Sequence, residues 1–431
     1  MKLAVVVQRY GANINGGAEL HARYIAEHLA RHADVEVMTT CAVDYVTWRN
    51  ELPRGRDEVH GLTVHRFPVE RERNVKLFAR RSTQVFEQPH SQDDELAWLD
   101  SEGPASRALV KHLRSMRAAY DFFLFFSYRY YHSFHGIHAV GSRALLVPTA
   151  ERDEVIGLSL FGPVFRGVRA LMYNSPEERA MITAATSNDE VPGVVVGIGS
   201  DVPPRPDPLR FRAKYGINGR FAIYVGRIDE NKGCRELFEF FLRYTRARRA
   251  ALTLVLIGHA VLEVPKDPRI RHLGFLPDED KFDAIAAAEL LIMPSYYESL
   301  SMVALEAWAL GRPVLANGRC EVLKGQCIRS NAGLFYETYE EFGEALGSIA
   351  ENALLAEALG MNGRVFYRRH YDWPVIERKY LTMLEALKAE DEAGVRPREV
   401  TPLPGWLARR RRNLPPSKEI LAQIPTGPVL S

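Results

Sequence analysis

A repeated pattern of short apolar segments, glycine-containing loops and amphipathic stretches most limits the folds available to this chain. Residues 3–7 form a β-branched run, residues 11–17 are rich in glycine and asparagine, and residues 19–30 have helical apolar spacing. Residues 35–39 are then typical of a second buried strand. A strand, a loop, a helix and a further strand form a βαβ unit, so the pattern predicts a parallel sheet covered by helices on both faces.

The alternation continues through the first half of the chain and then starts again, which predicts two α/β domains. Strand candidates follow at residues 122–126 and 144–147, with an amphipathic helix expected over 106–120. The second series comprises a strand at 221–225, a loop at 226–233, a helix at 234–243 and strands at 252–257 and 290–293. We expect two doubly wound, Rossmann-like domains that face each other across a cleft, with ligands at the carboxyl ends of the strands.

Four parts are predicted from this organisation. They are an N-terminal domain (1–200), a C-terminal domain (201–370), a helix that packs back on the N-terminal domain (371–390) and a proline- and arginine-rich tail (391–431). The proline-rich segment 202–208 is interpreted as a linker. Gly197 and Gly199, just before it, are compatible with a hinge or with a plain β-turn.

Composition excludes several classes of protein. The chain is 46% hydrophobic and 26% charged with a net charge of +2, so its overall charge predicts no nucleic-acid partner. Its four cysteines form no C-x-x-C pair, which favours a reducing cytosol over a disulfide framework. No run reaches the roughly 18 to 20 apolar residues that span a bilayer, and residues 3–7 are too short for a signal peptide. We expect a cytoplasmic protein, dissolved or lying at the inner face of the membrane.

The segment between Pro294 and Val314 contains the most informative motif, a pair of glutamates eight residues apart. An apolar strand and a Pro-Ser turn lead to Glu298, and a helix is expected to start directly after it. Along such a helix Glu298 and Glu306 would lie roughly 12 Å apart and nearly on one side, with the free amides of residues 299–301 facing a bound anion. By spacing alone, a charge at a helix N-terminus and a salt-bridged helix residue explain the pair better.

A second motif is the glycine-flanked loop from Gly226 to Gly233, which follows a predicted strand. Arg227 presents a planar fork of donors and Lys232 a compact charge, a combination suited to the oxygens of a diphosphate. Surface cations are common, so this pair alone is weak evidence. Its order relative to the glutamate pair within one domain is stronger evidence.

Together these motifs resemble the signature of glycosyltransferase family four, a family with the GT-B fold. The resemblance rests on the E-x7-E pair between Pro294-Ser295 and Gly311-x-Pro313, on the G-R-x4-K-G loop and on Gly16-Gly17-Ala18-Glu19. It implies an α/β GT-B fold and a retaining glycosyltransferase. Such an enzyme would move a hexose-type sugar from a nucleotide diphosphate sugar to a glycan, lipid-linked or small-molecule acceptor on the side of the N-terminal domain.

The resemblance also implies roles for individual residues. Arg227 and Lys232 would hold the donor diphosphate, Glu306 the ribose hydroxyls and Glu298 the hydroxyls of the transferred sugar. Leu276 lies within residues 269–277, which resemble the base-reading loop of the family, and would lie beside the nucleobase. The predicted donor-binding residues are Gly16, Gly17, Gly226, Leu276, Ser299, Leu300, Ser301 and Glu306.

The first domain departs from the family pattern at the position that faces the transferred sugar. Many relatives carry a polar pair with a histidine after a later strand, whereas residues 147–154 contain no histidine. We assign that role to Glu151 or Asp153. His132 and His135 are further candidates for lining the acceptor side of the cleft. The predicted catalytic residues are Glu298, Arg227, Lys232, Asp153 and Glu151.

Neither a metal nor another cofactor is expected. Asp278-Glu279-Asp280 is a D-x-D sequence, but it follows Pro277 and is interpreted as the first turn of a helix, where acids complement the dipole. No pair of carboxylates suggests a nucleophile and an acid. The hypothesis is front-face departure of the nucleotide diphosphate, stabilised by cations and amides, while a phosphate oxygen takes the acceptor's proton.

Two basic, partly apolar segments leave open whether the acceptor lies at a membrane or in solution. Residues 71–81 carry five cations interleaved with Val75, Leu77 and Phe78, and residues 107–117 carry four more. Such segments are compatible with peripheral contact with an anionic membrane and equally with a solvated helix face. Two rival functions also stay open: a GT-B-like sugar-nucleotide epimerase, and a non-catalytic nucleotide-sugar binder or scaffold.

Overall fold

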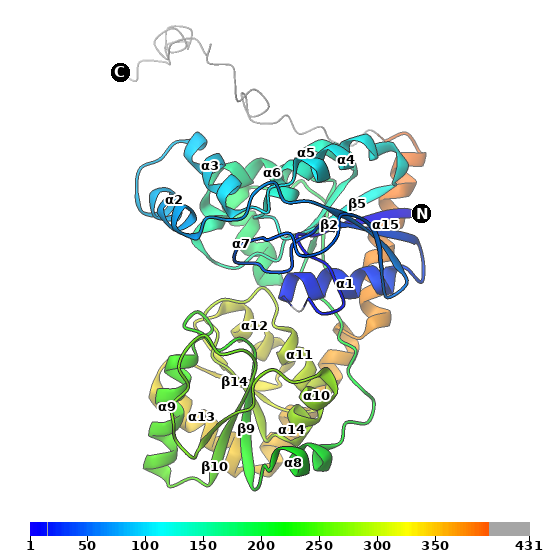
Figure 1. The fold of residues 1–431 in the computed structure, drawn as a ribbon. Helices are drawn as coiled ribbons and strands as arrows, with labels where there is room; N and C mark the ends of the chain where they lie inside the picture. Colours follow the sequence, from blue (N-terminus) through cyan, green and yellow to red (C-terminus); the bar gives the residue numbers. More distant parts are fainter. Residues whose placement is uncertain (15, 396–431) are drawn as a thin grey trace, which may run out of the picture.

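The computed structural model describes residues 1–14 and 16–395, which form two α/β domains, each built on one sheet (Figure 1). The N-terminal domain holds an eight-stranded sheet and the C-terminal domain a six-stranded sheet. Two Rossmann-like domains, as the repeated alternation predicts, are confirmed. Asn15 and residues 396–431, which make up most of the predicted tail, lie outside the described residues.

The sheet of the N-terminal domain is parallel except at one edge, where β3 and β4 pair antiparallel. Its strands run in the order β3-β4-β2-β1-β5-β6-β7-β8. The strands are β1 (Lys2–Val6), β2 (Asp34–Thr40), β3 (Gly55–Val59), β4 (Leu62–Phe67), β5 (Phe122–Phe126), β6 (Ala144–Val147), β7 (Ala170–Tyr173) and β8 (Gly193–Val195). The order reverses between β1 and β5, which is the switch point where doubly wound sheets bind ligands.

Helices cover both faces of this sheet. They are α1 (Gly17–Leu29), α2 (Val75–Glu87), α3 (Gln92–Glu102), α4 (Arg107–Ser115), α5 (Tyr131–Val140), α6 (Gly162–Gly167) and α7 (Pro176–Thr186). Because successive side chains of a strand point to opposite faces, β1 contributes to two cores. Leu3 and Val5 pack in the core that contains α1, whereas Ala4 and Val6 pack in the core that contains α4 and α5.

The C-terminal domain repeats the plan with a parallel sheet in the order β11-β10-β9-β12-β13-β14. Its strands are β9 (Arg220–Val225), β10 (Leu252–Ile257), β11 (Ile270–His272), β12 (Leu290–Met293), β13 (Val314–Asn317) and β14 (Gly333–Tyr336). Its helices are α8 (Pro208–Tyr215), α9 (Cys234–Arg248), α10 (Asp278–Ala287), α11 (Met302–Ala309), α12 (Glu321–Ser330), α13 (Tyr339–Glu351) and α14 (Ala353–His370). The switch point of this sheet lies between β9 and β12.

Several elements have the bounds predicted from the sequence, and two helix predictions are wrong. β5, β6, β10 and β12 occupy the ranges expected from their apolar runs. The helix expected over 106–120 ends at Ser115. The helix expected directly after Glu298 begins only at Met302, because Ser301 adopts a left-handed φ of 71° and caps the helix from outside.

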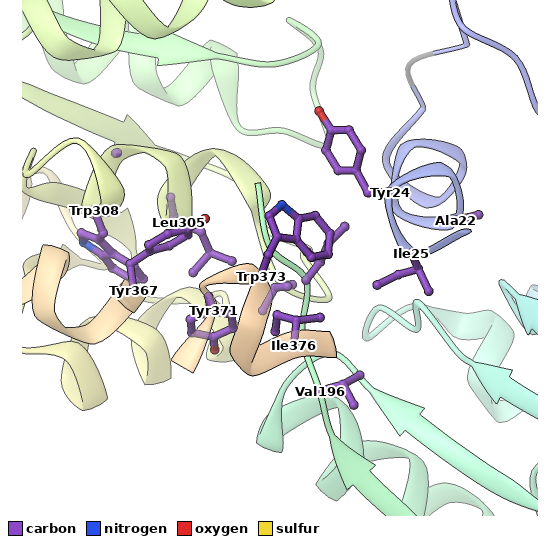
Figure 2. Close-up of a cluster of buried hydrophobic side chains, with 14 of the residues drawn as sticks. Ala22, Tyr24, Ile25, Val196, Leu305, Trp308, Tyr367, Tyr371, Trp373 and Ile376 are labelled. Carbon is purple, nitrogen blue, oxygen red and sulfur yellow. The ribbon is translucent and has the colours of Figure 1, made fainter. Parts of the chain in front are cut away.

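The chain passes between the domains twice, and both crossings meet in one aromatic cluster (Figure 2). A Cβ on Gly197 would lie 2.6 Å from Tyr371 Cε1, and a Cβ on Gly199 would lie 2.6 Å from Trp373 Cδ2. The two glycines therefore allow the first crossing to pack directly on the rings of the second. A larger residue at either position would push the crossings apart.

Helix α15 (Trp373–Glu392) follows the C-terminal domain in sequence but runs along the N-terminal domain (Figure 1). Near its start, Trp373 stacks on His28 of α1 with ring centroids 3.5 Å apart, and Glu377 Oε1 lies 2.6 Å from His28 Nδ1. Near its end, Glu390 forms an ion pair of 2.6 Å with Arg169. These contacts fix the C-terminal helix on the N-terminal domain.

Candidate functional site

A cavity of about 700 Å³ lies between the two domains, at the carboxyl ends of both sheets. Its lining comes from the loops after β1, β5 and β6 in the N-terminal domain and after β9 and β12 in the C-terminal domain. These loops flank the switch points of the two sheets. The size and position are those of a site for a small organic ligand.

The loop after β9 places Arg227 on the C-terminal wall of the cavity. Its Nη1 donates to the Tyr45 hydroxyl of the N-terminal domain at 3.0 Å, and its Nε donates to Asp229. The side chain is 42% exposed. Gly226, which precedes it, lines the cavity and has a φ of 152°, a conformation that favours glycine. Arg227 is therefore a cation that a ligand in the cavity can reach.

Lys232 and Glu298 form an ion pair on the same wall, with Nζ 2.8 Å from Oε1. Burial lowers the pKa of Lys232, but the charges of Glu298 and Glu151 outweigh burial and raise that pKa above its ordinary value. The ammonium group thus stays charged. With Arg227, it gives the wall two cations at the end of one strand, an arrangement that suits a ligand with two negative charges.

Glu298 lies in the loop between β12 and α11, so the predicted helical spacing between it and Glu306 is wrong. Residues Ser299, Leu300 and Ser301 line the cavity as part of this loop. The first amides of α11 belong to Met302 and Val303, which also line the cavity. The positive end of the helix dipole therefore faces the ligand space from a point three residues later than expected.

Glu306 is a buried carboxylate of α11 with only one satisfied oxygen. Its Oε1 accepts from Lys281 Nζ at 3.0 Å and from the Ser200 hydroxyl at 3.0 Å. Its Oε2 is buried without a hydrogen-bond partner, and the residue lines the cavity. An unpaired buried acceptor costs free energy. This oxygen therefore favours a ligand that brings a hydroxyl or amide donor.

The start of α1 forms the opposite wall. Gly16, the N-cap residue, has no side chain with which to cap the helix, and Gly17 begins it. Both line the cavity. A Cβ on Gly16 would lie 2.2 Å from Glu19 Oε2, whereas a Cβ on Gly17 would have nothing within 4 Å. Glu19 is in turn paired with the buried Arg9, with Nη2 2.5 Å from Oε1.

The loop after β6 brings Glu151 and Asp153 to the cavity. Burial raises the pKa of the Glu151 carboxyl to about 7; Lys232 opposes this, and the charges of Glu298 and Asp153 add to it. Burial likewise raises the pKa of Asp153, against the nearby charge of Arg129, whose Nη1 lies 3.0 Å from Asp153 Oδ2. Glu151 is thus a group that can take or release a proton near neutral pH.

Three predicted site residues do not line this cavity. His132 is fully buried, and its Nε2 lies 3.2 Å from the Phe126 carbonyl oxygen. Burial lowers the pKa of His132 to about 4, so the ring is neutral. His135 is also not among the described residues that line the cavity, and Leu276 is buried in the hydrophobic core. The prediction that the histidines line the cleft is therefore wrong, because α5 turns this face into the domain core.

The structure also brings in residues that the sequence did not single out. Arg9, Tyr45 and Arg129 lie on the N-terminal wall, and Lys281 lies on the C-terminal wall. Only Lys281 had a local signal, since it stands in the helix that begins with the D-x-D sequence. Several further lining residues carry buried polar atoms without a partner: Gln8 Oε1, His21 Nε2, Tyr128 OH, Asn174 Oδ1 and Ser295 Oγ.

The D-x-D sequence opens α10, as expected. Asp278 pairs with Lys281 at 3.1 Å and Asp280 with Lys214 at 2.7 Å. Neither carboxylate is among the described residues that line the cavity. Both therefore act at the helix terminus and in its ion pairs.

The basic segments of the N-terminal domain are partly used inside the fold. Arg73 is paired with the buried Glu102 at 3.0 Å, and Arg81 donates to the Ala97 carbonyl at 2.6 Å. Lys76 and Arg80 are exposed on α2. No helix within residues 1–14 and 16–395 is long and apolar enough to cross a membrane. Membrane contact stays a prediction.

Comparison with solved structures identifies the fold. Sucrose-phosphate synthase from Thermosynechococcus elongatus aligns over 90% of this chain and 99% of its own, with a TM-score of 0.66 and 17% sequence identity. Alr3699/HepE from Anabaena, in complex with UDP and glucose, aligns over 90% and 100% with a TM-score of 0.65 and 16% identity. The chain has the GT-B fold.

Sequence comparison gives a family match for the C-terminal domain. Residues 209–366 match the family model described as Glycosyl transferases group 1. An O-antigen chain mannosyltransferase B from Escherichia coli is 29% identical over 34% of this chain and 39% of its own length. A D-inositol 3-phosphate glycosyltransferase from Corynebacterium efficiens is 25% identical over 52% and 58%. The matches thus span about two fifths to three fifths of these curated relatives.

Proposed function

We propose that the chain is a retaining glycosyltransferase of family four that transfers a hexose-type sugar from a nucleotide diphosphate sugar to an acceptor hydroxyl. The observation that carries the proposal is the set of groups on the C-terminal wall. Arg227 and Lys232 lie at the end of β9, Glu298 lies beside Lys232, and Glu306 presents an unpaired oxygen to the same cavity. These groups match the diphosphate, sugar and ribose of such a donor.

In this proposal, the diphosphate binds between Arg227, Lys232 and the amides at the start of α11. Glu298 accepts hydrogen bonds from the transferred sugar, and Glu306 Oε2 accepts one from the ribose. Binding of UDP and glucose by the Anabaena neighbour supports UDP-glucose as a first donor to test. The backbone at Gly17 allows phosphate to approach because nothing occupies the space where its Cβ would lie.

The reaction that we infer leaves the anomeric configuration unchanged. The bond between the anomeric carbon and the diphosphate oxygen breaks, and its electron pair stays on the diphosphate. The acceptor oxygen then bonds to the same face, while its proton moves to a diphosphate oxygen. Arg227 and Lys232 stabilise the charge that grows on the leaving group, which is the role that a metal has in other sites. No cofactor is required by this scheme.

The acceptor lies on the N-terminal wall in this proposal. The names of the relatives support more than one kind of acceptor, since they include an enzyme of an O-antigen chain and one of D-inositol 3-phosphate. A glycan, a lipid-linked sugar and a small molecule are therefore all candidates. For a lipid-linked acceptor, the protein would act at the inner face of a membrane and should sediment with anionic vesicles.

Thermal shift and nucleotide release test the donor half of the proposal. UDP, GDP and ADP, and their glucose or mannose derivatives, should be screened for a rise in melting temperature, because a ligand that binds the folded state stabilises it. The best donor should then release nucleotide, slowly with water and faster with an acceptor. A chain that binds a nucleotide sugar but never releases nucleotide is a binder and not an enzyme. A chain that converts the sugar without transferring it is an epimerase.

A further inference from the structure

The N-terminal wall of the cavity contains two arginines, and each is paired with at least one carboxylate. Arg9 bonds Glu19 through Nε at 2.7 Å and Nη2 at 2.5 Å, while its Nη1 donates to the Val43 carbonyl at 2.6 Å. The side chains of Arg9 and Glu19 are 10% and 6% exposed. A ligand cannot reach this guanidinium without breaking a buried ion pair.

Arg129 is held between two carboxylates. Its Nε lies 3.1 Å from Glu102 Oε1, and its Nη1 lies 3.0 Å from Asp153 Oδ2. Asp153 uses its other oxygen to accept from the Val155 amide at 3.2 Å. The charge of Arg129 is therefore balanced from both sides, and the charges of these carboxylates raise its pKa.

The remaining groups on this wall are uncharged or acidic. Burial lowers the pKa of His21 to about 3, so its ring is neutral. Glu151 adds a third carboxylate to Glu19 and Asp153. Among the described residues that line the N-terminal wall, no cation lacks a carboxylate partner. Above about pH 7, where Glu151 is ionised, three carboxylates face two arginines on this wall, and a second anion placed here would meet net negative charge.

A smaller cavity of about 210 Å³ beside Glu298 has the same charge pattern. Arg152 pairs with Glu321 at 2.8 Å and Arg319 pairs with Glu236 at 3.0 Å. Glu177, Glu178 and Glu321 line this cavity together with the two arginines. Within the described residues, each arginine of this cavity has a carboxylate partner, and the glutamates that line the cavity outnumber the arginines.

Neutral hydrogen-bonding groups, in contrast, are unpaired on the N-terminal wall. Gln8 Oε1, His21 Nε2 and the Tyr128 hydroxyl are buried there without partners. The residues are 1%, 4% and 2% exposed. A hydroxyl-rich ligand would supply donors and acceptors to these atoms, whereas a phosphate would supply acceptors alone. The part of the wall that contains Gln8, His21 and Tyr128 thus suits hydroxyls better than a second phosphate, whereas the donor phosphate approaches the wall at Gly17.

We propose that the part of the acceptor that enters this cavity is an uncharged polyol or sugar, and not a sugar phosphate. This inference rests on the proposed function and selects among its acceptor classes. Specificity arises here from repulsion by Glu151 and Asp153 and from the engaged arginines, as well as from hydroxyl contacts. Phosphate groups carried elsewhere on a long acceptor, outside both cavities, do not conflict with it.

Matched pairs of acceptors test the inference. Glucose, mannose and myo-inositol should each be compared with their monophosphates for stimulation of nucleotide release, with products identified by mass spectrometry. We expect at least one neutral member to stimulate release, and each such member to exceed its phosphate about tenfold or more. A phosphate that is the better member of its pair overturns the inference, and so does the absence of stimulation by every compound.

A substitution separates electrostatic selection from a structural role. Asp153→Asn leaves Arg129 with Glu102 alone, so we expect the ratio of phosphorylated to neutral acceptor rates to rise about tenfold. Glu154→Gln is the matched control, because Glu154 is exposed and is not among the described residues that line either cavity. An unchanged ratio in Asp153→Asn contradicts the inference.

Donor turnover distinguishes this inference from the proposed function. Release of nucleotide to water needs no acceptor. If it is absent with every donor, the proposed function fails. If it is present and sugar phosphates are preferred, only the acceptor inference fails.

Discussion

The two walls of the cavity carry similar residue types but hold them differently. On the C-terminal wall, Arg227 is 42% exposed and Lys232 is 26% exposed, so an incoming anion can replace their carboxylate partners. On the N-terminal wall, the Arg9–Glu19 pair is 10% and 6% exposed, whereas Arg129 is 30% exposed and is held by two carboxylates, of which Glu102 is 5% exposed. Cations that a ligand can reach are suited to bind an anion, whereas cations held in buried ion pairs stabilise the wall. For the reaction that we propose, this comparison favours binding of the diphosphate on the C-terminal wall and of an uncharged acceptor on the N-terminal wall.

The largest effect is expected from removal of an accessible cation. Arg227→Ala should lower turnover by on the order of 10² or more, because charge on the leaving diphosphate would lose a preorganised donor. The measurement is nucleotide release at saturating donor. Arg235→Ala is the control, since this exposed arginine of α9 pairs with Glu230 at the surface. Equal turnover in both variants would remove the electrostatic basis of the mechanism.

Alanine substitutions at the two glycines at the start of α1 should have different effects, one on stability and the other on turnover. Gly16→Ala places a methyl group 2.2 Å from Glu19 Oε2, so the buried pair with Arg9 must shift. We expect a loss of about 1–3 kcal/mol of stability, seen as a lower melting temperature. This variant disturbs the buried Arg9–Glu19 ion pair without replacing either charged residue.

Gly17→Ala is the counterpart, because no protein atom lies within 4 Å of the position that its Cβ would take. Alanine also suits a helix better than glycine, so the melting temperature should stay or rise. Turnover should nevertheless fall about tenfold, since the methyl group would occupy space needed for the close approach of donor phosphate. Full activity in Gly17→Ala would show that the donor does not approach this backbone.

Much of the fold could be predicted from the sequence because its strands are short, apolar and buried on both faces. β5, β6, β10 and β12 were found at the predicted bounds for this reason. The start of α11 was missed because Ser301 caps the helix with a positive φ, which no local pattern signals for a serine. Gly197 and Gly199 were identified, but their role in aromatic packing depends on Tyr371 and Trp373, far along the chain.

The two walls also differ in how much of each could be predicted from the sequence. The C-terminal wall is built from two short motifs, 226–233 and 294–306, and the resemblance of both motifs to the family signature grouped Arg227, Lys232 and Glu298 at one site. The N-terminal wall is assembled from distant segments, and the partners of Arg9 and Arg129 depend on tertiary contacts. The prediction that His132 and His135 line the cleft was wrong because the depth of α5 in the core decides whether a side chain reaches the cavity.

The ionisation of Glu151 should make the stability of the fold depend on pH. Its folded pKa of about 7 lies above the ordinary value of 4.5, so ionisation destabilises the fold as pH rises between these values. Glu151→Gln should therefore match the native protein near pH 4.5 and exceed it by on the order of 1–3 kcal/mol at pH 8. Thermal unfolding across this range is the measurement.

Glu154→Gln provides the control for that experiment. Glu154 is exposed, so its replacement should give the same small difference at every pH. A constant difference for Glu151→Gln as well would mean that Glu151 ionises normally and is solvated. Glu151 would then not be a group that exchanges a proton near neutral pH.

The smallest expected effect lies at a hydrogen bond that joins the two walls. The Tyr45 hydroxyl accepts from Arg227 Nη1 at 3.0 Å, and Tyr45 is 44% exposed. A donor diphosphate that takes this guanidinium must replace the bond. Tyr45→Phe should therefore tighten nucleotide diphosphate binding by about two- to fivefold, in keeping with a partly exposed bond worth under about 1 kcal/mol. Titration calorimetry measures the change. Weaker binding would instead mean that Tyr45 orients Arg227 toward the phosphate, and that the N-terminal wall takes part in holding the donor.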